Sequence, residues 1–379
     1  MDKLKVISVF GTRPEAIKMA PLVKKLEEHT ESVVCVTAQH RQMLDQVLDI
    51  FGISPKYDLD IMKEGQTLSG ITSAVTNGLC GIFEKEKPDL CLVHGDTTTT
   101  FAAALASFYS HVKVGHVEAG LRTYDKEQPY PEEMNRQLVG RLADLHFSPT
   151  KAARENLLGE HTPRESIFVT GNTAIDCIKN TVRKDYVFGE KTLNNLDFSR
   201  KIIAMTAHRR ENLGEPLENI CRAARRIVDE HADAELVYAV HLNPAVQKTV
   251  HALLDSHPRI HLVDPLDIND MHNLMSRSFL IFTDSGGIQE EAPSFNVPVL
   301  VLRNVTERPE GVAAGTLLLA GVNEDEIYAA ASRLFGDKTL YEKMQNAKNP
   351  FGDGNASARI VQAVLYSFGR ANTRPDDYL

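Results

Sequence analysis

The stretch TDSGGIQEE, residues 283–291, follows the apolar run FLIF, residues 279–282. A short apolar run that leads into a polar, glycine-containing turn predicts a buried strand, a sharp turn and the start of a helix. Asp284 or Ser285 can cap this helix, and the two glycines leave backbone N–H groups uncovered. Because the first turn of a helix has partial positive charge, an anionic phosphate can bind there.

Glu291 lies further along the same predicted helix. A carboxylate just beyond a phosphate site can accept hydrogen bonds from ribose hydroxyls, as the acidic residue of a dinucleotide-binding unit does. A well-capped turn without any ligand explains the stretch equally well, because glycine pairs at helix starts are common. The stretch alone therefore leaves a nucleotide site and a purely structural turn open.

The composition is that of an ordinary globular protein with two domains. The chain has 379 residues, 42% hydrophobic and 25% charged, which is too long for one core. Its net charge of −9 argues against nucleic acid as a partner but does not exclude a small anionic ligand. The five cysteines are scattered and form no C-x-x-C pair, so we expect a reduced, cytoplasmic protein. The sequence shows no signal-peptide pattern and no apolar stretch of membrane-spanning length, so we expect no membrane association.

Apolar runs typical of strands alternate with helix-periodic segments, and this plan occurs twice. Such a repeat indicates an α/β protein with two doubly wound parallel sheets. The predicted strands of the first half are residues 5–10, 33–37, 90–94 and 113–117. Those of the second half are residues 201–206, 235–240, 260–263, 279–282 and 298–302. In open sheets of this kind, ligands bind beyond the carboxyl ends of the strands.

The same pattern predicts the division of the chain into domains. We expect a first domain of residues 1–171 and a second domain of residues 201–354. Residues 172–200 are polar and weakly periodic toward their end, and we interpret them as a linker. Residues 355–379 have helical spacing, and we expect this helix to pack back on the first domain.

Charged side chains follow the predicted strands of the first domain. Arg13 and Lys18 come after the first strand, and phosphate recognition needs paired cations of this kind, although surface cations are usually only solvated. Asp96 and Glu118 come directly after later strands, and Glu132 comes at the start of a later helix. Asp96 can also simply cap a helix, and acids such as Glu132 usually just offset the helix dipole. Three acids at the carboxyl ends of one sheet suggest proton transfer in addition to binding.

Two histidines occupy matching places in the second domain. His208 and His241 each follow a predicted strand, and histidine is the usual residue where a group must titrate near neutral pH. Single histidines are more often structural, but two in equivalent positions favour a functional site. No histidine pair has metal-ligand spacing, and no G-x-S-x-G or Walker motif occurs, so a serine hydrolase and a P-loop NTPase are disfavoured.

Together these motifs resemble the bacterial non-hydrolysing UDP-N-acetylglucosamine 2-epimerases, from GTRPE at residues 11–15 to NPFGDG at residues 349–354. The likeness covers nearly the whole chain, and the combination is more specific than any single motif. It implies two Rossmann-like domains of glycosyltransferase-B type that face a central cleft. It also implies interconversion of UDP-GlcNAc and UDP-ManNAc for cell-surface polysaccharide, without a metal or a cofactor. We expect a homodimer.

The resemblance also implies roles for individual residues. Those matching acid/base or electrostatic positions are Asp96, Glu118, Glu132 and His208. Those matching positions that hold UDP or its sugar are Arg13, Lys18, His241, Leu266, Met271, Ser285, Gly286, Gly287, Glu291 and Arg308, with Leu266 and Met271 matching in position only. An activator site for a second UDP-GlcNAc would include Gln39, His40, Gln42, Glu132, Arg209 and His241.

The mechanism implied by the family is elimination of UDP across C1–C2, which gives 2-acetamidoglucal. UDP then adds back after a proton returns to the opposite face of C2. Two of the three acids would exchange this proton, while His208, Arg13 and the helix start at residues 285–287 would stabilise the departing diphosphate. We expect the site to form fully when the domains close around UDP.

Three departures from the family pattern stand out. Gly65 replaces a basic residue before Gln66, and the lost cation would weaken activation. Ala239 replaces a common proline, and FNV at residues 295–297 replaces a smaller glycine-containing turn.

Other classes share parts of this pattern. A hydrolysing epimerase would release free ManNAc, and a retaining glycosyltransferase of the same fold would need an acceptor site instead of a ring of acids. A nucleotide-sugar sensor would bind UDP-GlcNAc without exchanging the hydrogen at C2.

Overall fold

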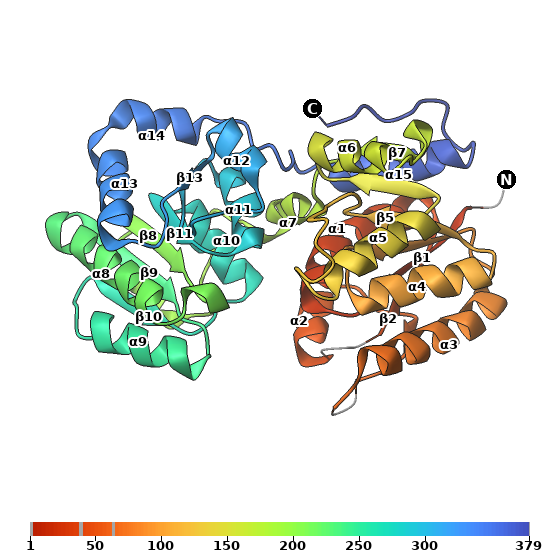
Figure 1. The fold of residues 1–379 in the computed structure, drawn as a ribbon, viewed down its shortest axis with the longest axis horizontal. Helices are drawn as coiled ribbons and strands as arrows, with labels where there is room; N and C mark the ends of the chain where they lie inside the picture. The colour runs from red at the N-terminus through yellow and green to blue at the C-terminus, as the bar shows by residue number, and fades with distance from the viewer. Residues whose placement is uncertain (1–2, 38–40, 63–64, 379) are drawn as a thin grey trace. The chain divides into compact units, whose positions relative to one another are not determined.

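The computed structural model describes residues 3–37, 41–62 and 65–378. The chain forms two compact units (Figure 1). Unit 1 consists of Met1–Cys177 with Gly352–Leu379, and unit 2 consists of Ile178–Phe351. The chain therefore leaves unit 1 within helix α7 (Thr173–Thr181) and returns to it before the last helix, α15 (Ala356–Ser367).

Unit 1 is built on a seven-stranded parallel sheet with the order β3-β2-β1-β4-β5-β6-β7. The strands are β1 (Lys5–Phe10), β2 (Glu31–Val36), β3 (Tyr57–Asp58), β4 (Leu90–His94), β5 (Lys113–Val117), β6 (Leu145–Ser148) and β7 (Ile167–Val169). The strand order reverses between β1 and β4. The loops that leave these two strands therefore diverge to opposite faces and open a crevice between them, which is where such sheets bind ligands.

Helices cover both faces of this sheet. They are α1 (Arg13–His29), α2 (Arg41–Phe51), α3 (Leu68–Glu86), α4 (Thr98–Tyr109), α5 (Glu132–Leu142) and α6 (Lys151–Gly159), besides α7 and α15. Figure 1 shows α3, α4 and α5 side by side along one face, where their apolar side chains share a core with β1 and β4. The other face is covered by α1, α2 and α15, and Ile360, Val361 and Val364 of α15 are buried beside α1.

Unit 2 repeats the plan with a six-stranded parallel sheet in the order β10-β9-β8-β11-β12-β13. The strands are β8 (Lys201–Thr206), β9 (Ala234–Ala239), β10 (Ile260–Val263), β11 (Leu280–Thr283), β12 (Val299–Val301) and β13 (Leu317–Leu319). The helices are α8 (Glu215–Glu230), α9 (Pro244–Leu254), α10 (Ile268–Ser276), α11 (Gly286–Glu291), α12 (Pro309–Ala314), α13 (Glu324–Gly336) and α14 (Lys338–Gln345). Its strand order reverses between β8 and β11, so the two loops after these strands bound its crevice.

Residues 178–200 belong to unit 2 and include part of the predicted linker. Tyr186, Phe188 and Phe198 of this segment pack against the apolar cluster beneath β8 and β11. The Arg277 guanidinium lies over the rings of Phe188 and Phe198, at 5.1 and 5.5 Å from their centroids. These aromatic contacts fix the segment on the unit surface although its composition is polar.

The prediction of two doubly wound parallel sheets is confirmed. Strands β1, β4, β5, β8 and β10 have the predicted bounds, and β1, β4 and β8 are largely buried runs rich in apolar residues. Strands β3, β6, β7 and β13 were not predicted. They have only two to four residues, and β6 reads LHFS, which has too little apolar character to stand out. In the turn at residues 295–297, Asn296 has φ of 56°, a left-handed conformation that asparagine tolerates.

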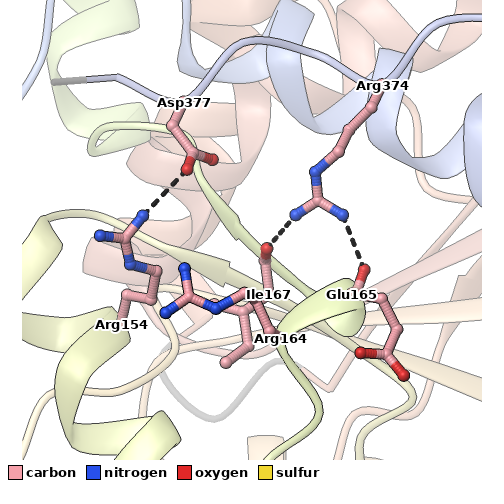
Figure 2. A pocket seen from close by; sticks show the side chains of 6 residues that line it. All are labelled: Arg154, Arg164, Glu165, Ile167, Arg374 and Asp377. Atoms are coloured by element: carbon pink, nitrogen blue, oxygen red, sulfur yellow. Dashed lines mark hydrogen bonds and ion pairs between the residues drawn. The ribbon is translucent and has the colours of Figure 1, made fainter.

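The last described residues run along β7, the edge strand of the first sheet (Figure 2). Arg374 donates to the carbonyls of Glu165 and Ile167, and its guanidinium stacks on the Phe168 ring at 4.0 Å. An oxygen of Asp377 accepts the Val169 N–H at 3.1 Å, and the other pairs with Arg154. The tail therefore satisfies backbone groups that an edge strand would otherwise leave open, and a surface pocket of about 400 Å³ remains beside it.

Within the described residues, no helix is both long enough and apolar enough to cross a membrane.

Arg374→Ala removes two donors to the β7 edge and one cation–π contact. We expect it to lower the free energy of unfolding by about 1–2 kcal/mol. Urea unfolding followed by circular dichroism measures the change, and Arg370→Ala, an exposed arginine just after α15, is the matched control. Equal midpoints for the two variants would contradict this account of the tail.

Candidate functional site

The loop after β1 is held by a buried carboxylate, that of Glu15. One oxygen accepts the N–H groups of Gly11 and Thr12 at 3.0 and 2.7 Å. The other accepts the hydroxyls of Thr97 and Thr100 at 2.7 and 3.2 Å, in the loop after β4 and the first turn of α4. Glu15 therefore ties together the two loops at the point where the strand order reverses.

Close packing of the loop after β1 against Thr37, which follows β2, requires a glycine at position 11. A Cβ on Gly11 would lie 2.0 Å from Oγ1 of Thr37, which in turn lies 3.2 Å from Oγ1 of Thr99. Thr97 caps α4 by accepting the Thr100 N–H at 3.1 Å. The run of threonines in the sequence thus binds the loops to each other, and its hydroxyls at 97, 99 and 100 are used within the protein.

Three predicted acids, Asp96, Glu118 and Glu132, come close together in unit 1. Asp96 follows β4, pairs with Arg136 at 2.9 Å, and lies within electrostatic reach of Glu118 and Glu132. Burial raises the pKa of the Asp96 carboxyl to about 6, and the negative charges of the other two acids add to this effect against the opposing charge of Arg136. The cluster therefore holds an acid that titrates near neutral pH.

Glu118 follows β5 and has a left-handed backbone, with φ of 65°. Its Oε2 forms an ion pair with Lys18 and accepts a hydrogen bond from the Asn172 amide at 3.1 Å. Lys18 was predicted as a ligand for UDP or its sugar, and in this structure its ammonium contacts the Glu118 carboxylate. Arg13 lies five residues earlier, at the first position of α1, and is partly exposed.

The turn under these acids is fixed by a neutral histidine, His116. Burial lowers its pKa to about 3, so at neutral pH its Nε2 acts as an N–H donor to the Gly95 carbonyl at 2.7 Å. Gly95 has φ of 70°, a conformation that glycine adopts without strain. The backbone that presents Asp96 is thereby attached to the strand that presents Glu118.

In unit 2 a second buried carboxylate, that of Asp284, has the role that Glu15 has in unit 1. Its Oδ2 accepts the N–H groups of His208 and Arg209, both at 2.8 Å, and the Asn212 amide at 2.9 Å. Its Oδ1 lies 3.5 Å from Nδ1 of His208. Burial lowers the pKa of His208 and the charge of Asp284 opposes this shift. The His241 ring stacks on His208 at 5.3 Å.

The expectation that Asp284 or Ser285 caps helix α11 by its side chain is wrong. Ser285 occupies the cap position but its side chain makes no cap hydrogen bond, and the Asp284 side chain turns back to the loop after β8. Two cations lie beside the helix start instead. A Cβ on Gly286 would lie 3.5 Å from Nη2 of Arg209 and 3.6 Å from Nη2 of Arg308, so two guanidinium groups lie against this turn. Each of them also pairs with an acid, Glu307 and Glu290 respectively.

The remaining predicted residues of unit 2 lie around this turn or beneath it. Glu291 accepts from His272 at 3.2 Å, and the opposite nitrogen of His272 lies 2.6 Å from the Thr181 hydroxyl. Leu266 and Met271 pack in the apolar cluster beneath β8 and β11. Arg308 is held by an ion pair with Glu290. A Cβ on Gly287 would lie 3.9 Å from Glu291 Oε1.

The predicted activator residues are only partly described. Gln39 and His40 lie outside the described residues, and Gln42 is in α2 with a side chain that is not described. Arg209 lies beside the start of α11, where it also pairs with Glu307 at 3.4 Å. His241 is exposed, and its Nδ1 accepts the Asn243 N–H at 3.1 Å.

Several residues that shape the site were missed by the sequence reasoning: Glu15, His94, His116, Arg136, Asn172 and His272. Only Glu15 has a clear local signal, since Thr12 and Glu15 have the spacing of a capping box and form one. The others act through contacts between distant parts of the chain. No group of three or more His, Cys, Asp or Glu side chains arranged to hold a metal occurs within residues 3–37, 41–62 and 65–378.

Two Rossmann-like units, each with its charged side chains at the switch point of a parallel sheet, define a two-domain protein of glycosyltransferase-B type. A model of the family described as UDP-N-acetylglucosamine 2-epimerase matches residues 24–365. The UDP-N-acetylglucosamine 2-epimerase of Bacillus subtilis is 57% identical over 380 residues, which cover 100% of this chain and 99% of that protein. The chain belongs to the UDP-N-acetylglucosamine 2-epimerase family. This similarity identifies it as an isomerase.

Solved structures agree with this assignment. The S. aureus MnaA–UDP structure is 54% identical with a TM-score of 0.89 and covers 99% of this chain and 100% of that chain. The UDP-GlcNAc 2-epimerase from Neisseria meningitidis, bound to UDP-GlcNAc, is 48% identical with a TM-score of 0.86. The match covers 96% of this chain and 100% of that chain. The family resemblance predicted from the sequence is confirmed.

Asp96→Asn tests the electrostatic cost of the acid cluster. Because the folded-state pKa of Asp96 lies above its ordinary value, the folded protein binds this proton more tightly, and stability falls as pH rises from about 4 to about 6. An asparagine at this position does not ionise, so it does not lose stability as the pH rises. We expect Asp96→Asn to be more stable than the parent by about 1–2 kcal/mol at pH 8, allowing for partial solvation, and by less at pH 5.

The measurement is the free energy of unfolding in urea at both pH values. Asp49→Asn, an exposed carboxylate on α2, is the control and should show no pH-dependent difference from the parent. A gap that stays constant between pH 5 and pH 8, or an Asp96→Asn protein less stable at pH 8, would refute the assigned pKa.

Proposed function

We propose that this protein interconverts UDP-GlcNAc and UDP-ManNAc without net hydrolysis. The single observation that supports this most directly is the cluster of Asp96, Glu118 and Glu132 at the switch point of unit 1, in a chain of the epimerase family. Inversion at C2 needs one group to remove a proton and another to supply one on the opposite face. A cluster of acids with one pKa near 6 fits that task, because proton transfer is most effective when the pKa is near the working pH.

The proposed reaction is balanced at each step. A carboxylate of the cluster removes the proton from C2 while the bond between C1 and the UDP oxygen breaks, which gives 2-acetamidoglucal and UDP. A carboxylic acid then protonates C2 from the other face, and the UDP oxygen forms the new bond to C1. No atom is gained or lost, and water is not a reactant.

Unit 2 would bind the UDP portion. The backbone N–H groups at the start of α11, together with the guanidinium groups of Arg209 and Arg308 beside Gly286, would supply positive charge for a diphosphate. His208 lies next to this turn and would stabilise the leaving diphosphate. Glu291, oriented by His272, would accept ribose hydroxyls. The relatives solved with UDP and with UDP-GlcNAc support this choice of ligand.

The incubation that tests the proposal uses UDP-GlcNAc as the only substrate in heavy water. We expect UDP-ManNAc to appear with deuterium at C2 of both nucleotide sugars, followed by NMR. Free ManNAc plus UDP as the main products would favour the hydrolysing alternative. Tight binding with no deuterium at C2 would indicate a sensor or a glycosyltransferase and overturn the proposal.

Glu118→Gln removes one proton-transfer group with little change of shape. We expect the rate of deuterium exchange at C2 to fall by at least ~100-fold, the usual range for loss of a general base. Glu165→Gln, an exposed glutamate of unit 1, is the control and should exchange at the parent rate. Normal exchange in Glu118→Gln would remove Glu118 from the mechanism.

We further propose that the enzyme is a cytoplasmic homodimer, that its product supplies cell-surface polysaccharide, and that UDP-GlcNAc activates it. Activation predicts sigmoidal rates with UDP-ManNAc as substrate that become hyperbolic when a little UDP-GlcNAc is added. Because Gly65 provides no cation, Gly65→Arg should lower the UDP-GlcNAc concentration needed for activation. Hyperbolic kinetics in both proteins from the outset would argue against an activator site.

A further inference from the structure

The Glu118 carboxylate is approached by three side chains from three separate elements. Lys18 comes from α1, Asn172 from the segment before α7, and His94 from the end of β4. All three approach the same oxygen, Oε2. The other oxygen, Oε1, lies over Gly95, where a Cβ would be 3.8 Å away. The contacts at Oε2 therefore fix the orientation of the carboxylate. Its second oxygen, Oε1, faces the loop that presents Asp96.

The orientation of the Asn172 amide follows from its second contact. Its Oδ1 accepts the Ala174 N–H at 2.9 Å, in the first turn of α7. The amide must then present its NH₂ group to Glu118, at 3.1 Å from Oε2. Asn172 is buried, with 4% of its surface exposed, so both halves of its amide are committed. An asparagine that only capped α7 would not need to face a carboxylate.

His94 is a buried histidine whose Nε2 has no evident structural role. Only 3% of the residue is exposed, and its Nε2 has no hydrogen-bond partner within the described residues. This nitrogen faces the Glu118 carboxylate, and the distance from Nε2 to Oε2 is 3.8 Å. Burial lowers the pKa of His94 to about 4, so the ring is neutral at pH 7 and can donate a hydrogen bond without adding charge. Hydrogen bonds in active sites often tighten only when substrate is bound.

We propose that Asn172 and His94 are positioning residues that fix the Glu118 carboxylate for proton transfer at C2. This inference rests on the proposed epimerase function. Lys18 supplies the positive charge at Oε2, and the two neutral donors select one rotation of the carboxylate. Misalignment of a proton-transfer group by even one ångström slows the chemical step while leaving binding intact. Positioning of this kind therefore predicts a loss in kcat with little change in KM.

Asn172→Asp is the most informative variant, because it is isosteric and keeps the oxygen that caps α7. It replaces the donor to Glu118 by a second carboxylate. We expect kcat to fall by ~10- to 100-fold, with KM for UDP-GlcNAc changed less than about threefold. The kinetic isotope effect with substrate deuterated at C2 should increase, because proton removal becomes more rate-limiting. Asn77→Asp, an exposed asparagine on α3, is the matched control.

A pair of His94 variants keeps the test decisive if Asn172→Asp does not fold. His94→Gln retains an N–H donor near the position of Nε2, whereas His94→Phe retains only the ring shape. We expect His94→Gln to keep a kcat several-fold higher than that of His94→Phe at equal thermal midpoints. A purely structural role would give the opposite order, since phenylalanine fills a buried ring site better than glutamine.

The outcomes separate this inference from the proposed function. If the parent protein places no deuterium at C2 of UDP-GlcNAc, the proposed function itself fails. If the parent is active but Asn172→Asp keeps its kcat and isotope effect, or raises only KM, the positioning role is refuted. Equal kcat values for His94→Gln and His94→Phe would likewise remove His94 from the role.

Discussion

The buried carboxylate of Glu15 is the interaction on which the site of unit 1 depends. A carboxylate that loses water must gain hydrogen bonds in return, and Glu15 gains four, two from the loop after β1 and two from the threonines beside β4. These loops diverge at the switch point of the sheet, and among the residues that the structure describes no backbone hydrogen bond joins them. Glu15 bridges them, so Lys18 on α1 and Asp96 after β4 are held in one fixed arrangement.

In unit 2 the carboxylate of Asp284 likewise joins two diverging loops. Its strand order reverses between β8 and β11, and the Asp284 side chain crosses that gap to accept two N–H groups and an amide from the loop after β8. His208 and Arg209 are thereby fixed beside the start of α11. In each unit a fully enclosed acid has a structural role, and the groups it positions are the ones left more open to a ligand.

The sequence predicts the sheets well and the site only in outline. Continuous buried runs such as β4 and β8 were predicted to the residue, and Asp96 and Glu118 were placed at strand ends by the same pattern. The edge strands β3, β7 and β13 were not predicted because two or three residues contain too little periodicity. Contacts such as Asn172 with Glu118 join residues 54 positions apart, and no local pattern specifies which distant donor meets which carboxylate.

The adjacent acids Glu132 and Glu133 show why residue type alone cannot assign a role. Successive residues on a helix point about 100° apart. Glu133 consequently turns inward, is fully buried, and accepts the N–H groups of Thr123 and Tyr124 together with the Gln137 amide. Although burial opposes them, those bonds favour the ionised form of Glu133 and lower the pKa of its carboxyl, whereas Glu132 remains partly exposed and contributes its charge to Asp96. Of these two neighbours, the enclosed Glu133 holds the loop of Thr123 and Tyr124, and the partly exposed Glu132 is the one that belongs to the acid cluster.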